Sequence, residues 1–155
     1  MKYSSGKIAE ICSAKIYGDK NIVVNHILTD SRSLIYPAST VFFAINGVQY
    51  DAHIFIPDLI KAGVKVFVVS ELPNEEYDAA FILTDNVISA LQNFAEYHRK
   101  QFNIPVVGIT GSNGKTIVKE WLSKILSKKY RITRSPKSFN SQIGVPLSVS
   151  LIDKK

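Results

Sequence analysis

The residues best suited to chemistry form a glycine-rich loop, GITGSNGKT, over residues 108–116. An apolar run over 104–107 comes directly before the loop, and a helical pattern follows it directly. In a loop of this kind, backbone N–H groups and the positive end of the helix can hold phosphate oxygens. Lys115 can reach the outer phosphates, and the Thr116 hydroxyl can bind Mg²⁺. We therefore predict a nucleotide-phosphate site, with the last two residues as its catalytic groups, made of Thr110, Gly111, Ser112, Asn113, Gly114, Lys115 and Thr116.

The spacing of the glycines departs from the most common P-loop. That pattern, G-x-x-x-x-G-K-[ST], has glycine where this chain has Ile109, whereas the glycines here stand at 108, 111 and 114. The alternative interpretation is a glycine-rich turn that only joins a strand to a helix. A G-K-T triplet that opens a helix directly after an apolar strand favours the phosphate site.

Hydrophobic periodicity predicts the elements that must hold this loop. Four runs rich in Val, Ile and Phe predict strands over 22–28, 41–45, 64–69 and 79–83. Helices are predicted after Ser4, between Asp51 and Gly63, and over 87–102. One face of the last helix carries Val87, Leu91, Phe94, Ala95 and His98. Strands that alternate with helices favour a mostly parallel α/β sheet.

A domain boundary is predicted near residue 103. The chain would then hold a small mixed α/β domain over 1–103 and the start of a P-loop parallel-sheet ATPase domain over 104–155. In the second part we expect strands over 104–107 and 130–133 and a helix with a buried stripe of Ile117, Val118, Trp121, Leu122, Ile125 and Leu126. Two strands are too few for a complete doubly wound sheet. We therefore expect the chain to be the N-terminal piece of a longer enzyme.

Composition and charge narrow the possible classes of protein. Cys12 is the only cysteine, so no internal disulfide can form, and the N-terminus does not resemble a secretory signal; we expect a cytoplasmic protein. No apolar run approaches the ~20 residues that span a membrane. Residues 115–155 carry ten Lys or Arg against two Asp or Glu, which suits either anionic ligands or a solvated helix face. Because Trp121 belongs to the apolar stripe, we expect no nucleic-acid partner.

Three segments, in this order and spacing, resemble the Mur ligases of peptidoglycan synthesis. The first segment combines DSR at 30–32 with FFA at 42–44, NG at 46–47 and DAH at 51–53. The second is TGSNGKT at 110–116, which matches the family's T-G-[ST]-x-G-K-[ST] and accounts for the unusual glycine spacing. The third is NSQIGVPL at 140–147. The resemblance covers essentially the whole chain, from a uridine-binding N-terminal domain into a central ATPase domain.

The resemblance implies an amide-forming ligase that uses ATP and Mg²⁺. Within the family, the chain is most similar to ligases that add D-alanyl-D-alanine to UDP-N-acetylmuramoyl-tripeptide through an acyl phosphate. The resemblance implies that the UDP-muramoyl-peptide is held by Ser31, Arg32, Asn46, Gly47, Asp51 and His53. It also implies that Asn140 approaches the ATP phosphates and that Thr116 binds Mg²⁺. Arg32 suits a diphosphate because its guanidinium forks to two oxygens.

Several alternatives stay open at the level of sequence. The segment 30–32 could be a capped surface turn, and Asn140 could only cap the following helix. Ala52 stands where the family usually has glycine, which predicts strain if the position needs a positive φ. The segment SPKSFNSQIGVPLS at 135–148 further resembles Bacteroidetes-type members of the family, in which an alanine racemase domain is joined to the ligase.

Other functions compete with the ligase that adds D-alanyl-D-alanine. A UDP-muramoyl-dipeptide amino-acid ligase and a folylpolyglutamate synthase-like enzyme belong to the same superfamily. A non-catalytic nucleotide-binding module is the third possibility. Because most of an ATPase sheet would lie elsewhere, we expect the 155-residue chain by itself to lack ligase activity.

Overall fold

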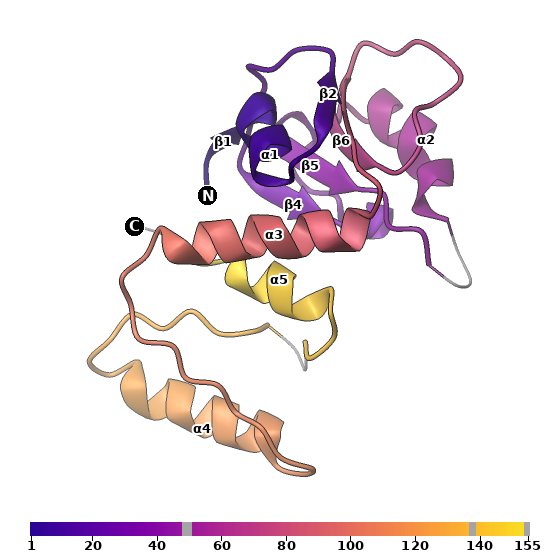
Figure 1. Ribbon diagram of the computed structural model, residues 1–155. Helices are drawn as coiled ribbons and strands as arrows, with labels where there is room; N and C mark the ends of the chain where they lie inside the picture. The colour runs from indigo at the N-terminus through magenta and orange to yellow at the C-terminus, as the bar shows by residue number, and fades with distance from the viewer. Residues whose placement is uncertain (48–50, 137–138, 154–155) are drawn as a thin grey trace.

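The computed structural model describes residues 1–47, 51–136 and 139–153 (Figure 1). Two residues of the segment 135–148, which resembles Bacteroidetes-type members, therefore lie outside the described residues: Lys137 and Ser138. The molecule is built on a five-stranded sheet in the order β2-β7-β6-β5-β4. Four of these strands are parallel, and β2 runs antiparallel to β7 at one edge. Their bounds are Lys15–Tyr17 (β2), His26–Leu28 (β4), Thr40–Phe43 (β5), Val66–Val69 (β6) and Ala80–Leu83 (β7).

Side chains alternate across the two central strands and bury both faces of the sheet. Val41 and Phe43 of β5 enter one hydrophobic cluster, whereas Phe42 enters the other. The register pairs Val41 with Val66, so β6 follows the same alternation. Because every residue of β5 and β6 is buried, helices must cover both faces. The predicted α/β class with a mostly parallel sheet is confirmed.

Helices pack on each face of this sheet (Figure 1). Helices α1 (Ser5–Ile11) and α3 (Val87–Lys100) share a cluster with one face. The short η3 helix (Ala52–Phe55) and α2 (Ile56–Lys61) share a cluster with the other face. The Ser4 side chain caps α1 and the Asn86 side chain caps α3, each accepting a backbone N–H from the first turn. The residues predicted to share the buried face of α3 are all buried.

The single strand predicted over 22–28 is two strands in two sheets. β3 (Val23–Val24) pairs antiparallel with β1 (Tyr3–Ser4), while β4 joins the main sheet. The chain switches sheets at Asn25, whose N–H donates to the carbonyl of Ser39. Two short 3₁₀ turns, η1 (Ser31–Ser33) and η2 (Pro37–Ser39), follow β4. The break falls at the polar pair Asn25 and His26, within a run whose other residues are all apolar.

The structure contradicts several expectations for the chain beyond α3. No strand forms over 104–107 or 130–133, and Val106 and Val107 are both exposed. Helix α4 (Lys115–Leu126) forms as predicted, but none of its residues is buried, and Trp121 is 67% exposed. A parallel strand and an apolar helix face become buried only when neighbouring strands lie beside them. Within the described ranges, no such strands adjoin this segment.

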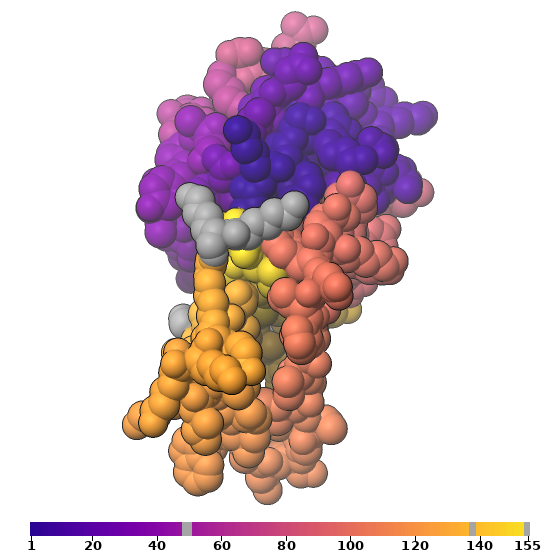
Figure 2. Space-filling model, turned by 90° about the vertical axis from the view of Figure 1, so that its left-hand side faces the viewer, coloured from indigo at the N-terminus to yellow at the C-terminus, as the bar shows by residue number. Residues whose placement is uncertain are grey.

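The two regions after α3 differ in how they contact the body of the molecule. Helix α5 (Gly144–Val149) packs along α3, whereas α4 projects away from the sheet (Figure 1). The space-filling view shows the segment that carries α4 as a separate projection (Figure 2). Arg99 holds the start of the connection, since its guanidinium donates to the carbonyls of Phe102 and Ile104. In the part of the chain that the structure describes, no helix has the length and apolarity needed to cross a membrane.

Candidate functional site: a phosphate loop and a cluster at the sheet edge

The predicted phosphate loop leads directly into α4, with two glycines in the left-handed region. Gly111 has φ +143° and Gly114 has φ +78°. Gly114 is the N-cap of α4, and its carbonyl accepts the first helical hydrogen bond, from the N–H of Val118 at 2.9 Å. A side chain at Gly114 would be strained by its φ alone, because no other atom lies close to a Cβ placed there. The backbone path of this loop therefore explains the glycines at 111 and 114.

The side chain of Lys115 folds back over the loop. Its Nζ atom donates to the carbonyl of Gly111 and lies 3.4 Å from the carbonyl oxygen of Ser112. Residues 110–114 are exposed to solvent. An anion bound by the N–H groups of this loop would therefore lie beside the ammonium group of Lys115.

Thr116, the predicted Mg²⁺ ligand, is the second residue of α4 and is exposed. The described residues contain no group of three or more His, Cys, Asp or Glu that could hold a metal ion. Mg²⁺ usually binds through few protein oxygens together with waters and substrate phosphates. The residues present therefore suit an ion that arrives with a nucleotide, with the Thr116 hydroxyl as its protein ligand.

Asn140 lines a groove that the phosphate loop does not share. It lines a groove of about 450 Å³ between α3 and α5, together with residues such as Gln92 and Val145, and no residue of 108–116 lines this groove. The alternative role considered for Asn140, capping the next helix, belongs to Ser141. The Ser141 hydroxyl accepts the backbone N–H of Gly144 at 3.0 Å.

The second group of predicted residues gathers at one edge of the sheet. Parallel strands end at the same edge, and segments that follow them become neighbours there. Ser31 and Arg32 lie in η1 directly after β4, and 46–53 follows β5. The structure thus places Ser31, Arg32, Asn46, Gly47, Asp51 and His53 at the carboxyl edge of two adjacent strands.

The Arg32 guanidinium binds a carboxylate within its own turn. Its Nε and Nη2 atoms donate to the two carboxylate oxygens of Asp30, at 2.9 and 2.7 Å, and the same carboxylate caps the turn. The hydrogen bonds from Arg32 hold the pKa of Asp30 below its usual value. The Arg32 side chain is 87% exposed, so it can turn from Asp30 toward a bound anion.

The two ends of the loop after β5 are joined by backbone contacts. Asn46 and Asp51 form an antiparallel bridge, and the N–H of Ala52 donates to the carbonyl of Ile45 at 3.2 Å. Ala52 lies in η3 with a negative φ and is buried. The strain predicted for an alanine at this position is therefore absent.

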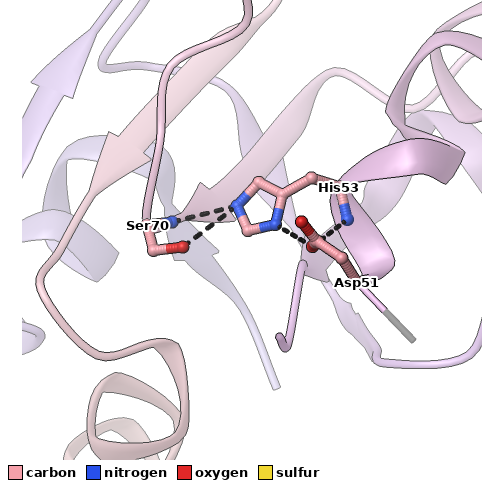
Figure 3. Close-up of polar contacts among 3 residues, drawn as sticks. All are labelled: Asp51, His53 and Ser70. Atoms are coloured by element: carbon pink, nitrogen blue, oxygen red, sulfur yellow. Dashed lines mark hydrogen bonds and ion pairs between the residues drawn. The ribbon is translucent and has the colours of Figure 1, made fainter. Parts of the chain in front are cut away.

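A set of polar contacts joins this loop to the neighbouring strand (Figure 3). The His53 Nδ1 atom lies 2.6 Å from a carboxylate oxygen of Asp51, which also accepts the backbone N–H of His53. On its other side, the Nε2 atom accepts the backbone N–H of Ser70 at 3.1 Å. Burial raises the pKa of Asp51, but its hydrogen bonds with His53 outweigh this, and the pKa lies below its usual value. Ser70 was missed from the sequence; its only signal there is a polar residue directly after a predicted strand.

A protein family and several individual proteins are similar to this chain. Residues 109–155 match the family described as Mur ligase middle domain. The UDP-N-acetylmuramoyl-tripeptide–D-alanyl-D-alanine ligase of Synechocystis sp. is 38% identical over 130 residues, which cover 82% of this chain and 28% of that relative. The chain belongs to the Mur ligase family.

Solved Mur ligases share the fold of this Mur ligase chain. The MurF of Acinetobacter baumannii superposes with a TM-score of 0.90 at 26% identity, covering 99% of this chain and 34% of that protein. The MurF ligase of Thermotoga maritima, solved in complex with ADP, has a TM-score of 0.71 at 27% identity and covers 82% of this chain and 29% of its own. This Mur ligase chain therefore spans between 28% and 34% of the lengths of these relatives.

Proposed function

We propose that the chain is part of an ATP-dependent ligase that adds D-alanyl-D-alanine to UDP-N-acetylmuramoyl-tripeptide. The observation that carries this proposal is the 38% identity with a ligase of that name. An alignment over 82% of the chain must include both the sheet-edge cluster and the phosphate loop. The aligned part of the chain therefore includes the residues that would hold each of two ligands.

The two clusters suit two separate ligands. In this proposal, residues 1–103 hold the UDP end of the muramoyl peptide at the carboxyl edge of the sheet, and 104–155 begin the ATP-binding domain. Ser31, Arg32, Asn46 and Gly47 face the nucleotide end of the substrate. The loop at 110–116 holds the ATP phosphates, and Thr116 supplies the protein ligand of Mg²⁺.

The chemistry needs activation of a carboxylate. A carboxylate is a poor electrophile, and transfer of the γ-phosphoryl group converts it to an acyl phosphate with phosphate as a leaving group. The amine of D-alanyl-D-alanine then attacks the acyl carbon, forms the amide and releases phosphate. Lys115 and the loop N–H groups offset negative charge at the phosphates, and Mg²⁺ bound with the nucleotide would add to this.

Isothermal titration of the purified chain tests both halves of the proposal. UDP-N-acetylmuramoyl-tripeptide is expected to bind, and Arg32→Ala is expected to weaken it about tenfold, the loss for one charged hydrogen bond. ATP with Mg²⁺ is expected to bind more weakly, because the described residues form no parallel sheet around the loop. Lys115→Ala should abolish that binding, whereas Lys124→Ala, on the same helix, should not change it. Absence of binding by the UDP-linked peptide would contradict the proposal.

A further inference from the structure

One side chain connects the end of the loop that follows β5 to the residue that follows β6. We call the residues Asp51, His53 and Ser70 the histidine clasp (Figure 3). The imidazole of His53 bridges a carboxylate oxygen of Asp51, at 2.6 Å, and the backbone N–H of Ser70, at 3.1 Å. The side chain of His53 is 16% exposed, so most of it is shielded from water. Both of its ring nitrogens thus have hydrogen-bond partners within the protein.

The partners of His53 determine which nitrogen carries the proton. A backbone N–H can only donate, so Nε2 must present its lone pair to Ser70. The proton of the neutral ring then lies on Nδ1 and is donated to Asp51. In the other tautomer, Nε2–H and the backbone N–H of Ser70 would both be donors and could not form a hydrogen bond. The clasp thus requires a single tautomer.

The order Asp, His, Ser resembles a nucleophile triad, but the distances show a different role. The Ser70 hydroxyl oxygen lies 3.4 Å from Nε2, farther than the backbone nitrogen of the same residue at 3.1 Å. Two donors therefore compete for one lone pair, and the backbone N–H has the better geometry. Nε2 is not free to take a proton from the hydroxyl, so Ser70 gains no nucleophilic activation.

The clasp is one of the contacts that hold the two ends of the loop. The Asn46–Asp51 bridge and the hydrogen bond from Ala52 to Ile45 join the loop's ends to each other. The same segment also contacts the sheet, since the N–H of Ala44 donates to the carbonyl of Val68 at 2.9 Å and buried Ala52 shares a cluster with Phe67. His53, two residues after Asp51, adds a side-chain contact to Ser70, which directly follows β6.

We propose that His53 is a positioning residue that places Asn46 and Gly47 for contact with the nucleotide end of a UDP-linked substrate. The inference rests on the proposed function, since that function assigns these two residues to the substrate. His53 acts through the loop and does not itself contact the ligand. Rigid placement of binding groups lowers the entropy lost on binding, so release of the loop should weaken affinity.

Two variants and one matched control separate positioning from general stability. His53→Gln keeps an acceptor for the Ser70 N–H, whereas His53→Ala removes both halves of the clasp. His26→Gln makes the same chemical change on β4, where the exposed ring stacks on Tyr36. We expect His53→Ala to lose UDP-N-acetylmuramoyl-tripeptide affinity about tenfold and to lose exchange protection at the Ser70 amide. His53→Gln should regain most of both, and His26→Gln should match the unaltered chain.

The tautomer gives a readout that does not depend on any ligand. A long-range ¹H–¹⁵N spectrum of the unaltered chain should show His53 protonated at Nδ1 and bare at Nε2. An Nε2-protonated ring, or unchanged affinity in His53→Ala, would overturn the inference and leave the proposed function standing. Failure of the unaltered chain to bind the UDP-linked peptide would instead overturn the proposed function, together with the substrate named here.

Discussion

The Nε2 atom of His98 lies 2.8 Å from the carbonyl oxygen of Ile152, so the middle of the chain is tied to a residue 54 positions later. A carbonyl only accepts, so Nε2 carries the proton. The Nδ1 atom then accepts the hydroxyl of Tyr3, also at 2.8 Å. The ring is 2% exposed and stacks on Phe94. One neutral imidazole thus connects α3 with the strand that begins the chain and with the end of the described residues.

This burial should make the stability of the chain sensitive to mild acid. Burial lowers the pKa of His98 below its usual 6.5, and the hydrogen bond with Ile152 offsets only part of this. The unfolded chain therefore binds a proton at a higher pH than the native chain does. The contribution of the neutral ring is complete above the usual pKa and is lost as pH falls through the lowered one.

Urea unfolding from about pH 7.5 to about pH 5.5 measures this effect. The free energy of unfolding should fall over that range in the unaltered chain and in the control His26→Gln. It should fall less in His98→Gln, which keeps a donor and an acceptor but does not titrate. An equal pH dependence in all three proteins would show that His98 is not the source.

Cys12 should be inert in the native protein. Burial raises the pKa of its thiol to about 12, and its Sγ atom lies 3.4 Å from the carbonyl oxygen of Ala90. The thiolate is the reactive form, and almost none is present near neutral pH. A thiol-specific disulfide reagent should therefore react only after urea unfolds the chain. Rapid stoichiometric reaction without urea would mean that α1 and α3 separate readily.

Phe94 should be among the most important residues for stability. Its ring is fully buried, with its centroid 5.2 Å from that of Tyr3 and 6.4 Å from that of Phe43. Phe94→Ala is expected to lower the free energy of unfolding by about 3–5 kcal/mol, because it removes apolar contacts and leaves a cavity. The matched change Trp121→Ala, on the exposed face of α4, should cost within about 0.5 kcal/mol. Similar losses for both variants would mean that α4 is covered in solution.

Gly114 and Gly108 provide a test of the loop geometry. No atom lies near a Cβ at either residue, but only Gly114 has a positive φ, at +78°. Gly114→Ala should cost about 1–2 kcal/mol at the start of α4, and Gly108→Ala should cost much less. Amide exchange at Val118, which donates to the Gly114 carbonyl, reports on that turn. Equal protection of this amide in the two variants would mean that Gly114 does not keep its positive φ in solution.

The sequence predicted the three central strands of the main sheet, for a local reason. The hydrophobic patterns of β5, β6, β7 and α3 indicate strand or helix from the residues of each segment alone. The patterns at 104–107, 130–133 and α4 were equally clear, but burial requires partners. Whether Trp121 is covered depends on other segments and not on the period of its own helix.

For the candidate sites, residue types were readable from the sequence and their connections were not. The phosphate loop and the residues of the sheet edge stand in short motifs, because local backbone geometry demands glycine or a capping side chain there. Ser70 has no motif, and it meets His53 only because β5 and β6 pair in parallel and end together. The sequence by itself thus determined the helices α1 to α4, the strands β5, β6 and β7 and the groups that could bind ligands. Only the tertiary structure decided which of those groups meet, because long-range pairing of strands brings distant residues to one edge.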